Sequence, residues 1–218
     1  MDKRMKNCLS SWSGGKDSAY ALYLAKLQGY QPIALLNMMN ERGLISRSHG
    51  IPFSVLKQQA AAMSIPLYAI PSSWEEYEAR FIQTLQSIQS ASPYSQVVFG
   101  DIDLQAHRDW EEKVCSAAGL TAFLPLWQRD RKELVLEMLQ AGFETIIVSC
   151  QSELGPDFLG KKLCTHLVQD LEARGIDPCG ENGEFHTLVT NCPLFKQPVQ
   201  LAIAGKIKHQ DYCFLQFR

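Results

Sequence analysis

The sequence lacks the features that mark several special classes of protein. No apolar run approaches the roughly 20 residues that a membrane-spanning helix needs, and the charged N-terminal stretch MDKRMKNCLSSW has no long apolar core of a secretory signal. Basic residues are not in excess either, because 21 Lys and Arg face 23 Asp and Glu for a net charge of −2. This balance argues against bulk nucleic-acid binding. We expect a cytoplasmic protein that binds neither membranes nor nucleic acid.

Paired cysteine motifs are also missing. No C-x-x-C occurs, and the cysteine count is odd and scattered along the chain. Free thiols in a reducing compartment explain this pattern, and a structural zinc or iron–sulfur site is not expected. The seven cysteines are Cys8, Cys115, Cys150, Cys164, Cys179, Cys192 and Cys213.

What is present is an alternation of short apolar runs with amphipathic stretches. Of the 218 residues, 46% are hydrophobic and 20% are charged, as in an ordinary globular protein. The runs of Val, Ile and Leu lack polar alternation, which is typical of strands buried on both faces. Strand–helix alternation at this spacing predicts an α/β fold with a Rossmann-like parallel sheet flanked by helices. The expected strands are NCLSSW, PIALLNM, PLYAI and QVVFG, and the expected helices cover residues 18–28, 52–63, 74–89 and 107–119.

The second half repeats the pattern more loosely. Helices are expected over residues 131–142 and 159–175, with the strand ETIIVSC between them. The segment IDPCGENGEFHT is rich in turn-forming residues, and residues 200–217 have the pattern of a β-hairpin. We therefore expect two domains, residues 1–122 and a smaller α/β domain of residues 123–218.

A glycine-rich turn, Ser13-Gly14-Gly15-Lys16-Asp17-Ser18, joins the first strand to the first helix. Glycines let backbone amides approach an anion, and a helix N-terminus adds positive potential. A lone Gly-Gly could be a plain turn with Ser18 as the helix N-cap. The full string adds a lysine for phosphate charge, two hydroxyls for phosphate oxygens and a carboxylate for Mg²⁺, so we interpret it as a phosphate site.

Two further polar clusters have the composition of a binding site. The first, within DPCGENGEFHTLV, combines Glu181, Glu184, His186 and Thr187 with glycines and could bind Mg²⁺ or orient an amine, although a solvated loop has a similar composition. The second, FGDIDLQAHRDWEE, begins at a predicted strand end, where open parallel sheets bind ligands. Asp101 and Arg108 are its candidates, and Asp109, Glu111 and Glu112 fit an exposed helix face.

The glycine turn resembles the pyrophosphate-binding loop (PP-loop) of the N-type ATP pyrophosphatases. Taken in order, SGGKDS, SHG, GDIDLQAHRDWEEKVCSAAGL, PLW, FLG and GENGEFHTLV resemble the diphthine–ammonia ligase family of that group over almost the whole chain. This resemblance implies an adenine nucleotide alpha hydrolase-like domain followed by a smaller one. It also implies ATP-dependent formation of an acyl-adenylate and attack by ammonia, with release of AMP.

The resemblance assigns roles residue by residue. Metal binding falls to Asp17 and Glu181, and ATP and Mg²⁺ are the implied cofactors. The remaining expected roles are catalytic for Lys16, Asp17, Glu181, Glu184 and His186; nucleotide-binding for Ser13, Gly14, Gly15, Lys16, Asp17, Ser18, His49, Asp101 and Arg108; and substrate-binding for Gly183, Glu184, His186 and Thr187.

The implied partners are ATP, free ammonia and an unidentified carboxylate acceptor, which could be a protein side chain. The chain could also form a homodimer. Asn182 and His186 are similar to the bacterial branch, since archaeal and eukaryotic members often have glycine and glutamate there. Diphthine belongs to the archaeal and eukaryotic translocation factor, so a bacterial member needs another acceptor. The alternatives are a tRNA-modifying ATP pyrophosphatase and a nucleotide-binding sensor without turnover.

Overall fold

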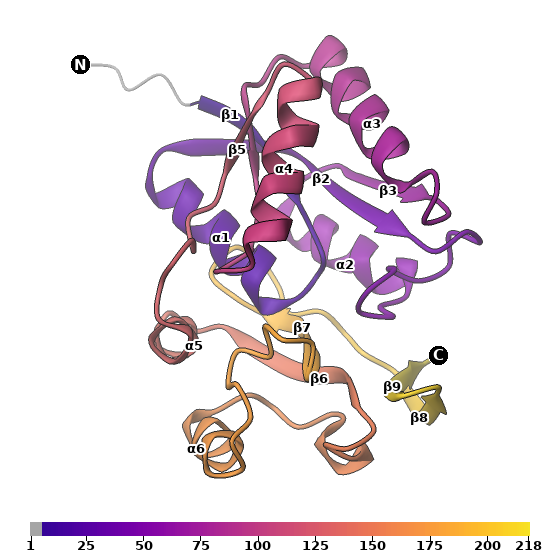
Figure 1. The fold of residues 1–218 in the computed structure, drawn as a ribbon, viewed down its shortest axis with the longest axis vertical. Coiled ribbons are helices and arrows are strands. Elements are labelled where there is room, and N and C mark those ends of the chain that lie inside the picture. Colours follow the sequence, from indigo (N-terminus) through magenta and orange to yellow (C-terminus); the bar gives the residue numbers. More distant parts are fainter. Residues whose placement is uncertain (1–5) are drawn as a thin grey trace.

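The computed structural model describes residues 6–218, which form a parallel sheet and an antiparallel sheet packed one above the other (Figure 1). All seven cysteines are free thiols, as expected, and six of them are buried. No helix in this described range is both long and apolar enough to cross a membrane.

The parallel sheet has the strand order β3-β2-β1-β4-β5, which confirms the predicted α/β fold. The order reverses between β1 and β4, and open α/β sheets bind ligands at such a point. Four strands were predicted, whereas the short β5 was missed. The bounds are β1 Lys6–Ser11, β2 Tyr30–Met39, β3 Leu67–Pro71, β4 Gln96–Val98 and β5 Thr121–Phe123.

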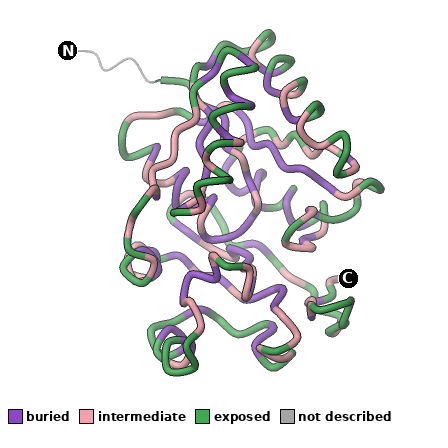
Figure 2. Tube along the Cα trace, in the orientation of Figure 1, coloured by how far each residue is buried: buried purple, intermediate pink, exposed green. Residues whose placement is uncertain are grey.

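Helices cover both faces of this sheet. Successive strand residues point to opposite faces, so Cys8 packs with the core that includes α1 and α2, and Leu9 packs with the core under α3 and α4. The result is a three-layer sandwich in which buried residues follow the strands (Figure 2). The helices are α1 Lys16–Leu27, α2 Phe53–Met63, α3 Tyr77–Ala91 and α4 Gln105–Ala117.

The antiparallel sheet has the strand order β7-β6-β9-β8 and lies below α1 and α2 in Figure 1. The hairpin predicted at the C-terminal end is present as β8 and β9. The elements are α5 Arg131–Gln140, β6 Glu144–Gln151, the 3₁₀ turn Pro156–Phe158, α6 Thr165–Ala173, β7 Phe185–Asn191, β8 Ile203–His209 and β9 Tyr212–Phe217.

Two predictions for this half were wrong in their extent. The helix expected over residues 159–175 begins only at Thr165, because Lys162 forms a β-bridge with Ile146 instead. The polar segment ending at Thr187 is only partly a turn, since β7 begins at Phe185 and pairs with β6. His186 and Thr187 therefore have the fixed directions of strand side chains.

One apolar core joins the two sheets. Leu22 of α1 and Leu56 of α2 belong to the same buried cluster as Ile147 of β6 and Leu188 of β7.

The parallel sheet ends at Phe123 and the next helix begins at Arg131. The glycine turn between β1 and α1 lies directly against β7 (Figure 1), where Val189 N donates to Gly14 O over 3.0 Å.

Candidate active site

The glycine turn is shaped by close backbone packing. Gly14 has φ +87°, and a Cβ there would lie 2.9 Å from both Gln59 Oε1 and Leu56 Cδ2. Only glycine adopts this conformation without strain. Helix α1 begins at Lys16 with Gly15 as its N-cap, two residues earlier than expected, so Ser18 is not the cap.

Hydroxyl groups hold the turn closed. Ser13 Oγ lies 3.0 Å from Ser18 Oγ and accepts a hydrogen bond from Gly15 N over 3.2 Å. Ser18 Oγ in turn donates to Gly15 O over 3.2 Å. These contacts gather two hydroxyls at the positive end of α1, where the helix dipole favours an anion.

Lys16 joins the turn to the second polar segment. Its Nζ donates to Asp17 Oδ2 over 2.8 Å and also to the carbonyl oxygen of Cys179, while its backbone N donates to Thr187 Oγ1 over 3.1 Å. Burial opposes the charge of this lysine, but the neighbouring Asp17 carboxylate raises its pKa above the ordinary value. The ammonium therefore stays charged although the side chain is almost fully buried.

A cavity of about 950 Å³ opens between the two sheets at this point. Both halves of the chain contribute residues to its wall. Ligand sites commonly lie between two packed units of this kind. The expected site residues that line it are Ser13, Lys16, Asp17, Ser18, His49, Asp101, Glu181, Gly183, His186 and Thr187. Gly14 and Gly15 are not among the lining residues, and their backbones pack against Gln59 and His49 respectively.

Arg108 and Glu184 do not line the cavity either. Arg108 donates to Glu112 Oε1 over 2.7 Å, and its guanidinium lies 5.0 Å from the centre of the Trp127 ring. Glu184 accepts hydrogen bonds from the backbone N and the side chain of Asn182, both over 3.1 Å. The side chains of Arg108 and Glu184 are engaged elsewhere, so the structure does not support the direct roles expected for them.

A pair of histidines lies beside the turn, one from each half of the chain. The ring centres of His49 and His186 are 4.5 Å apart, and a Cβ on Gly15 would lie 2.8 Å from His49 Nε2. Burial, followed by the charge of Lys16, lowers the pKa of His186 to about 4. Burial and His186 lower the pKa of His49 as well. Both imidazoles are therefore neutral at pH 7.

Carboxyl groups occupy another part of the cavity wall. Asp101 Oδ1 lies 2.7 Å from His107 Nδ1, and Glu181 accepts a hydrogen bond from Ile102 N over 3.2 Å. Burial, with Asp17 nearby, raises the pKa of Glu181 to about 7. Negative charge is concentrated here, which favours binding of a cation.

Glu111 differs from the exposed helix residue that the sequence suggested. Only 3% of it is exposed, and it lines the cavity. Burial, followed by the carboxylate of Asp101, raises its pKa to about 11. The helical spacing of Glu111 from the buried Val114 and Cys115 places all three on one face of α4, a signal that could have identified it.

Arg131 is a structural residue that the sequence analysis did not single out. Its guanidinium bonds to Asp103 over 2.6 and 2.8 Å and to Asp177 over 2.6 Å. It also donates to Asn182 Oδ1 over 3.2 Å. The arginine thereby fastens the turn before β7 to the loop after β4, which holds Glu181 over the cavity.

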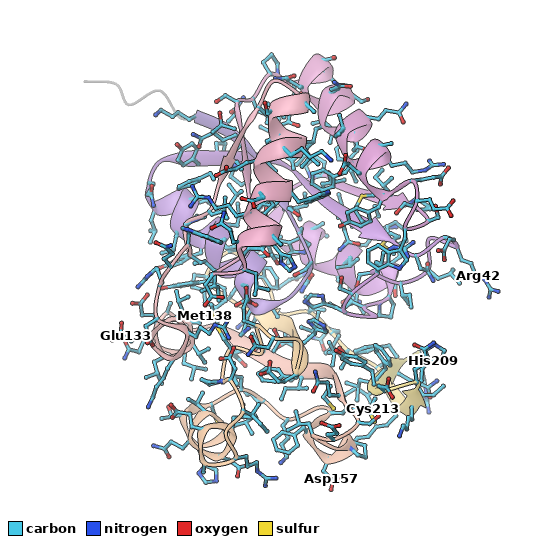
Figure 3. The ribbon with its side chains drawn as sticks, viewed as in Figure 1. Arg42, Glu133, Met138, Asp157, His209 and Cys213 are labelled. Carbon is cyan, nitrogen blue, oxygen red and sulfur yellow. The ribbon has the colours of Figure 1, made fainter. Side chains whose placement is uncertain are left out.

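His209, for which no role was expected, is labelled in Figure 3 on the β8–β9 hairpin and does not line the cavity.

Comparison with known proteins identifies relatives of the whole chain. The sequence model of the diphthamide synthase N-terminal domain family matches residues 5–122, and that of the diphthamide synthase C-terminal domain family matches residues 130–218. A diphthine–ammonia ligase of Mus musculus is 26% identical over 93% of this chain and 85% of its own length. The Danio rerio protein of that name is 28% identical over 93% of this chain and 89% of its own.

Among solved structures, a predicted subunit of tRNA methyltransferase from Methanocaldococcus jannaschii aligns with a TM-score of 0.41 and 14% identity, over 85% of this chain and 98% of that one. This likeness is too distant to support an inference. The two domain models, in contrast, together match most of the sequence in the order in which the structure arranges it. The chain belongs to the diphthamide synthase family.

Proposed function

We propose that this protein is an ATP-dependent, AMP-forming ligase that adenylates a carboxylate and transfers the acyl group to ammonia. The observation that carries the proposal is the shared cavity: the glycine turn and the segment ending at Thr187 line it together, and Lys16 N bonds directly to Thr187. A nucleotide on one side and an acceptor on the other would therefore meet. The names of the curated relatives support the same reaction.

The turn would bind the pyrophosphate part of ATP. The start of α1 supplies positive potential, and Lys16 supplies a buried positive charge. Both are fixed before ATP arrives, so they stabilise the negative charge that develops on the leaving pyrophosphate with little reorganisation. The Ser13 and Ser18 hydroxyls, which bond within the turn, would rotate to donate to phosphate oxygens. Cleavage between the α and β phosphates follows, with AMP and pyrophosphate as products.

Asp17 and Glu181 are the residues that would hold Mg²⁺. Both line the cavity, and burial, followed by the nearby Asp17 carboxylate, raises the pKa of Glu181, so a bound cation would favour its charged form. Among the described residues no group of three or more metal-ligating side chains occurs. That fits Mg²⁺, which usually uses one or two protein carboxylates together with substrate phosphates and water. When bound, the ion would neutralise phosphate charge.

The acceptor would lie beside β7. His49 and His186 present neutral rings to the cavity, so each can donate one hydrogen bond and accept another without a net charge. We assign His49 to the adenylate and His186, with Thr187 and Gly183, to the acceptor. Residues 1–122 would then be the nucleotide-binding domain and residues 123–218 the acceptor domain of a cytoplasmic enzyme. Diphthine, named in the curated relatives, is the first acceptor to test.

The test is product analysis. Purified protein is incubated with α-labelled ATP, Mg²⁺, ammonium chloride and a translocation factor that carries diphthine, and the nucleotides are separated by chromatography. We expect AMP and pyrophosphate that depend on both ammonium and acceptor, and Lys16→Ala as the inactive control. ADP as the main product would overturn the proposal. ATP binding without AMP, for diphthine and for a panel of other carboxylates, would make the protein a nucleotide sensor.

A further inference from the structure

Three titratable side chains form one corner of the cavity that the proposed pyrophosphate site does not use. Asp101 follows β4, and His107 and Glu111 project from one face of α4. His107 Nδ1 lies 2.7 Å from Asp101 Oδ1, and the ring is about half exposed. The imidazole therefore extends toward solvent from the Asp101 carboxylate, whose side chain is itself 27% exposed.

Glu111 gives this corner its chemical character. The side chain is 97% buried, and its Oε2 atom receives no hydrogen bond from any described residue. Leaving a buried polar atom unpaired destabilises the fold. When no cation occupies the corner, Glu111 stays protonated and shares its proton with the neighbouring Asp101, which agrees with the raised pKa of Glu111. A ligand that donates hydrogen bonds and carries positive charge would satisfy both carboxyls.

Two aromatic rings add a second preference for a cation. Tyr77 and Trp110 line the same cavity, with ring centres 5.6 Å apart. Aromatic faces attract ammonium groups, more strongly where water is excluded. Burial raises the pKa of the Tyr77 hydroxyl to about 12 against the opposing charge of Arg47, so the hydroxyl is a neutral donor or acceptor.

A divalent metal fits this corner less well than ammonium does. Magnesium demands near-octahedral coordination at about 2.1 Å, whereas ammonium needs only acceptors at hydrogen-bond distance, about 2.7–2.9 Å. Asp101 and Glu111 supply such acceptors.

We propose that Asp101, His107 and Glu111, with the rings of Tyr77 and Trp110, form the subsite that binds ammonium and delivers ammonia to the reaction. This inference rests on the proposed function, because it assigns the nitrogen substrate of that ligase to a place in the cavity. It also replaces the nucleotide contact that the sequence suggested for Asp101.

The chemistry balances with two protons released. Ammonium gives one proton to Asp101, and the ammonia lone pair forms a C–N bond with the acyl carbon of the adenylate. The bond between that carbon and the phosphate oxygen breaks, its electron pair leaves with AMP, and the new amide nitrogen loses the second proton. His107 bonds Asp101 and is exposed to solvent, so it can pass both protons outward.

The first test needs no acceptor and no turnover. Crystals of the full chain are soaked in thallium(I) acetate, whose ion resembles ammonium in size and is located by anomalous scattering. We expect a peak within about 3 Å of the carboxyls of Asp101 and Glu111. The peak should persist in Asp109→Asn, an exposed residue of the same helix, and disappear in Glu111→Gln. Excess ammonium acetate should remove it more effectively than equal potassium acetate.

Other outcomes of this test overturn the inference. A wild-type crystal without the peak, equal displacement by potassium, or a manganese(II) peak at the same position would each mean that the corner is not an ammonium subsite. The result does not depend on the ligase reaction, so it stands whether or not the proposed function is correct.

The second test applies once turnover has been observed. In Glu111→Gln, which keeps the shape of the side chain, the KM for ammonium should rise about tenfold or more, since a charge-assisted bond is lost. The KM for ATP should stay at the wild-type value. Asp101→Asn should act in the same direction, and Asp109→Asn should match the wild type. An unchanged KM for ammonium in folded Glu111→Gln would refute the subsite and leave the ligase function intact.

Discussion

Replacing Gln59 with leucine should destabilise the protein far more than its position on a surface helix suggests. Gln59 lies on α2 and is fully buried. Its Oε1 accepts from Trp12 Nε1 over 3.0 Å, and its Nε2 donates to Gly14 O over 3.0 Å and to Val189 O over 2.8 Å. One side chain thus connects β1, the glycine turn and β7.

The magnitude follows from these three bonds. Leucine has a similar volume, so the cavity term is small, but Trp12 Nε1 is left buried without a partner at a cost of about 1–3 kcal/mol. Losing the bonds to Gly14 O and Val189 O adds about 0.5–1.5 kcal/mol each. The sum is about 2–6 kcal/mol, a large part of the 5–15 kcal/mol that stabilises a typical domain.

Urea unfolding followed by tryptophan fluorescence measures this change. Gln58→Leu is the matched control, because the neighbouring Gln58 is exposed and only its Oε1 accepts a bond, from Gln200 N; it should cost less than about 1 kcal/mol. Gln59→Leu should also weaken ATP binding, since Gly14 loses an anchor. Equal stability of the two variants would refute the reasoning.

Three other variants test the site directly. Lys16→Ala should raise the Kd for ATP about 10- to 150-fold, because a charge-assisted contact worth about 1.5–3 kcal/mol is lost; unchanged affinity in calorimetry would contradict the phosphate site. Gly14→Ala should lower both stability and ATP affinity, because the φ of +87° is strained for alanine and its Cβ would lie 2.9 Å from Leu56 Cδ2. Glu111→Gln should gain stability relative to wild type as pH rises from 6 to 8. In the wild type the folded pKa of Glu111, about 11, exceeds the unfolded value near 4.5, so the unfolded state binds fewer protons and stability falls with pH. The loss approaches 1.4 kcal/mol per pH unit, and a difference between Glu111→Gln and wild type that stays constant with pH would contradict it.

The parallel sheet and the glycine turn were predictable because their signals are local. Short apolar runs buried on both faces identify strands without knowledge of their neighbours, and SGGKDS contains its own turn chemistry. The helix start at Lys16 rather than Ser18 differs by two residues, within the usual uncertainty of helix ends.

The second polar segment was harder to interpret because its structure depends on distant residues. Phe185 to Asn191 form a strand only because β6 offers an edge about forty residues earlier in the chain. Its glycines and carboxyl groups favour a turn by local rules, and they do form one up to Glu184. Arg131, whose bonds to Asp103 and Asp177 position that turn, has no local signal at all.

Glu111 was misjudged for a related reason. Acidic residues on a helix are exposed by default, and Asp109 and Glu112 follow that rule. Glu111 breaks it because α4 packs its inward face onto α3 and the sheet, where Val114 and Cys115 are buried. Burying an ionisable side chain on the apolar face of a helix costs folding free energy. Such a position is therefore itself evidence for a functional site.

The proposed phosphate site depends on both halves of the chain. Backbone groups of the glycine turn form hydrogen bonds to β7 without any ligand. Gly14 O accepts from Val189 N, and Lys16 N donates to Thr187 Oγ1. A turn with one glycine at positive φ would otherwise populate several conformations. Docking β7 against it selects one, and the same strand carries His186 into the cavity. The contact that shapes the glycine turn therefore also positions His186, and the proposed acyl transfer between two bound substrates would require such an alignment.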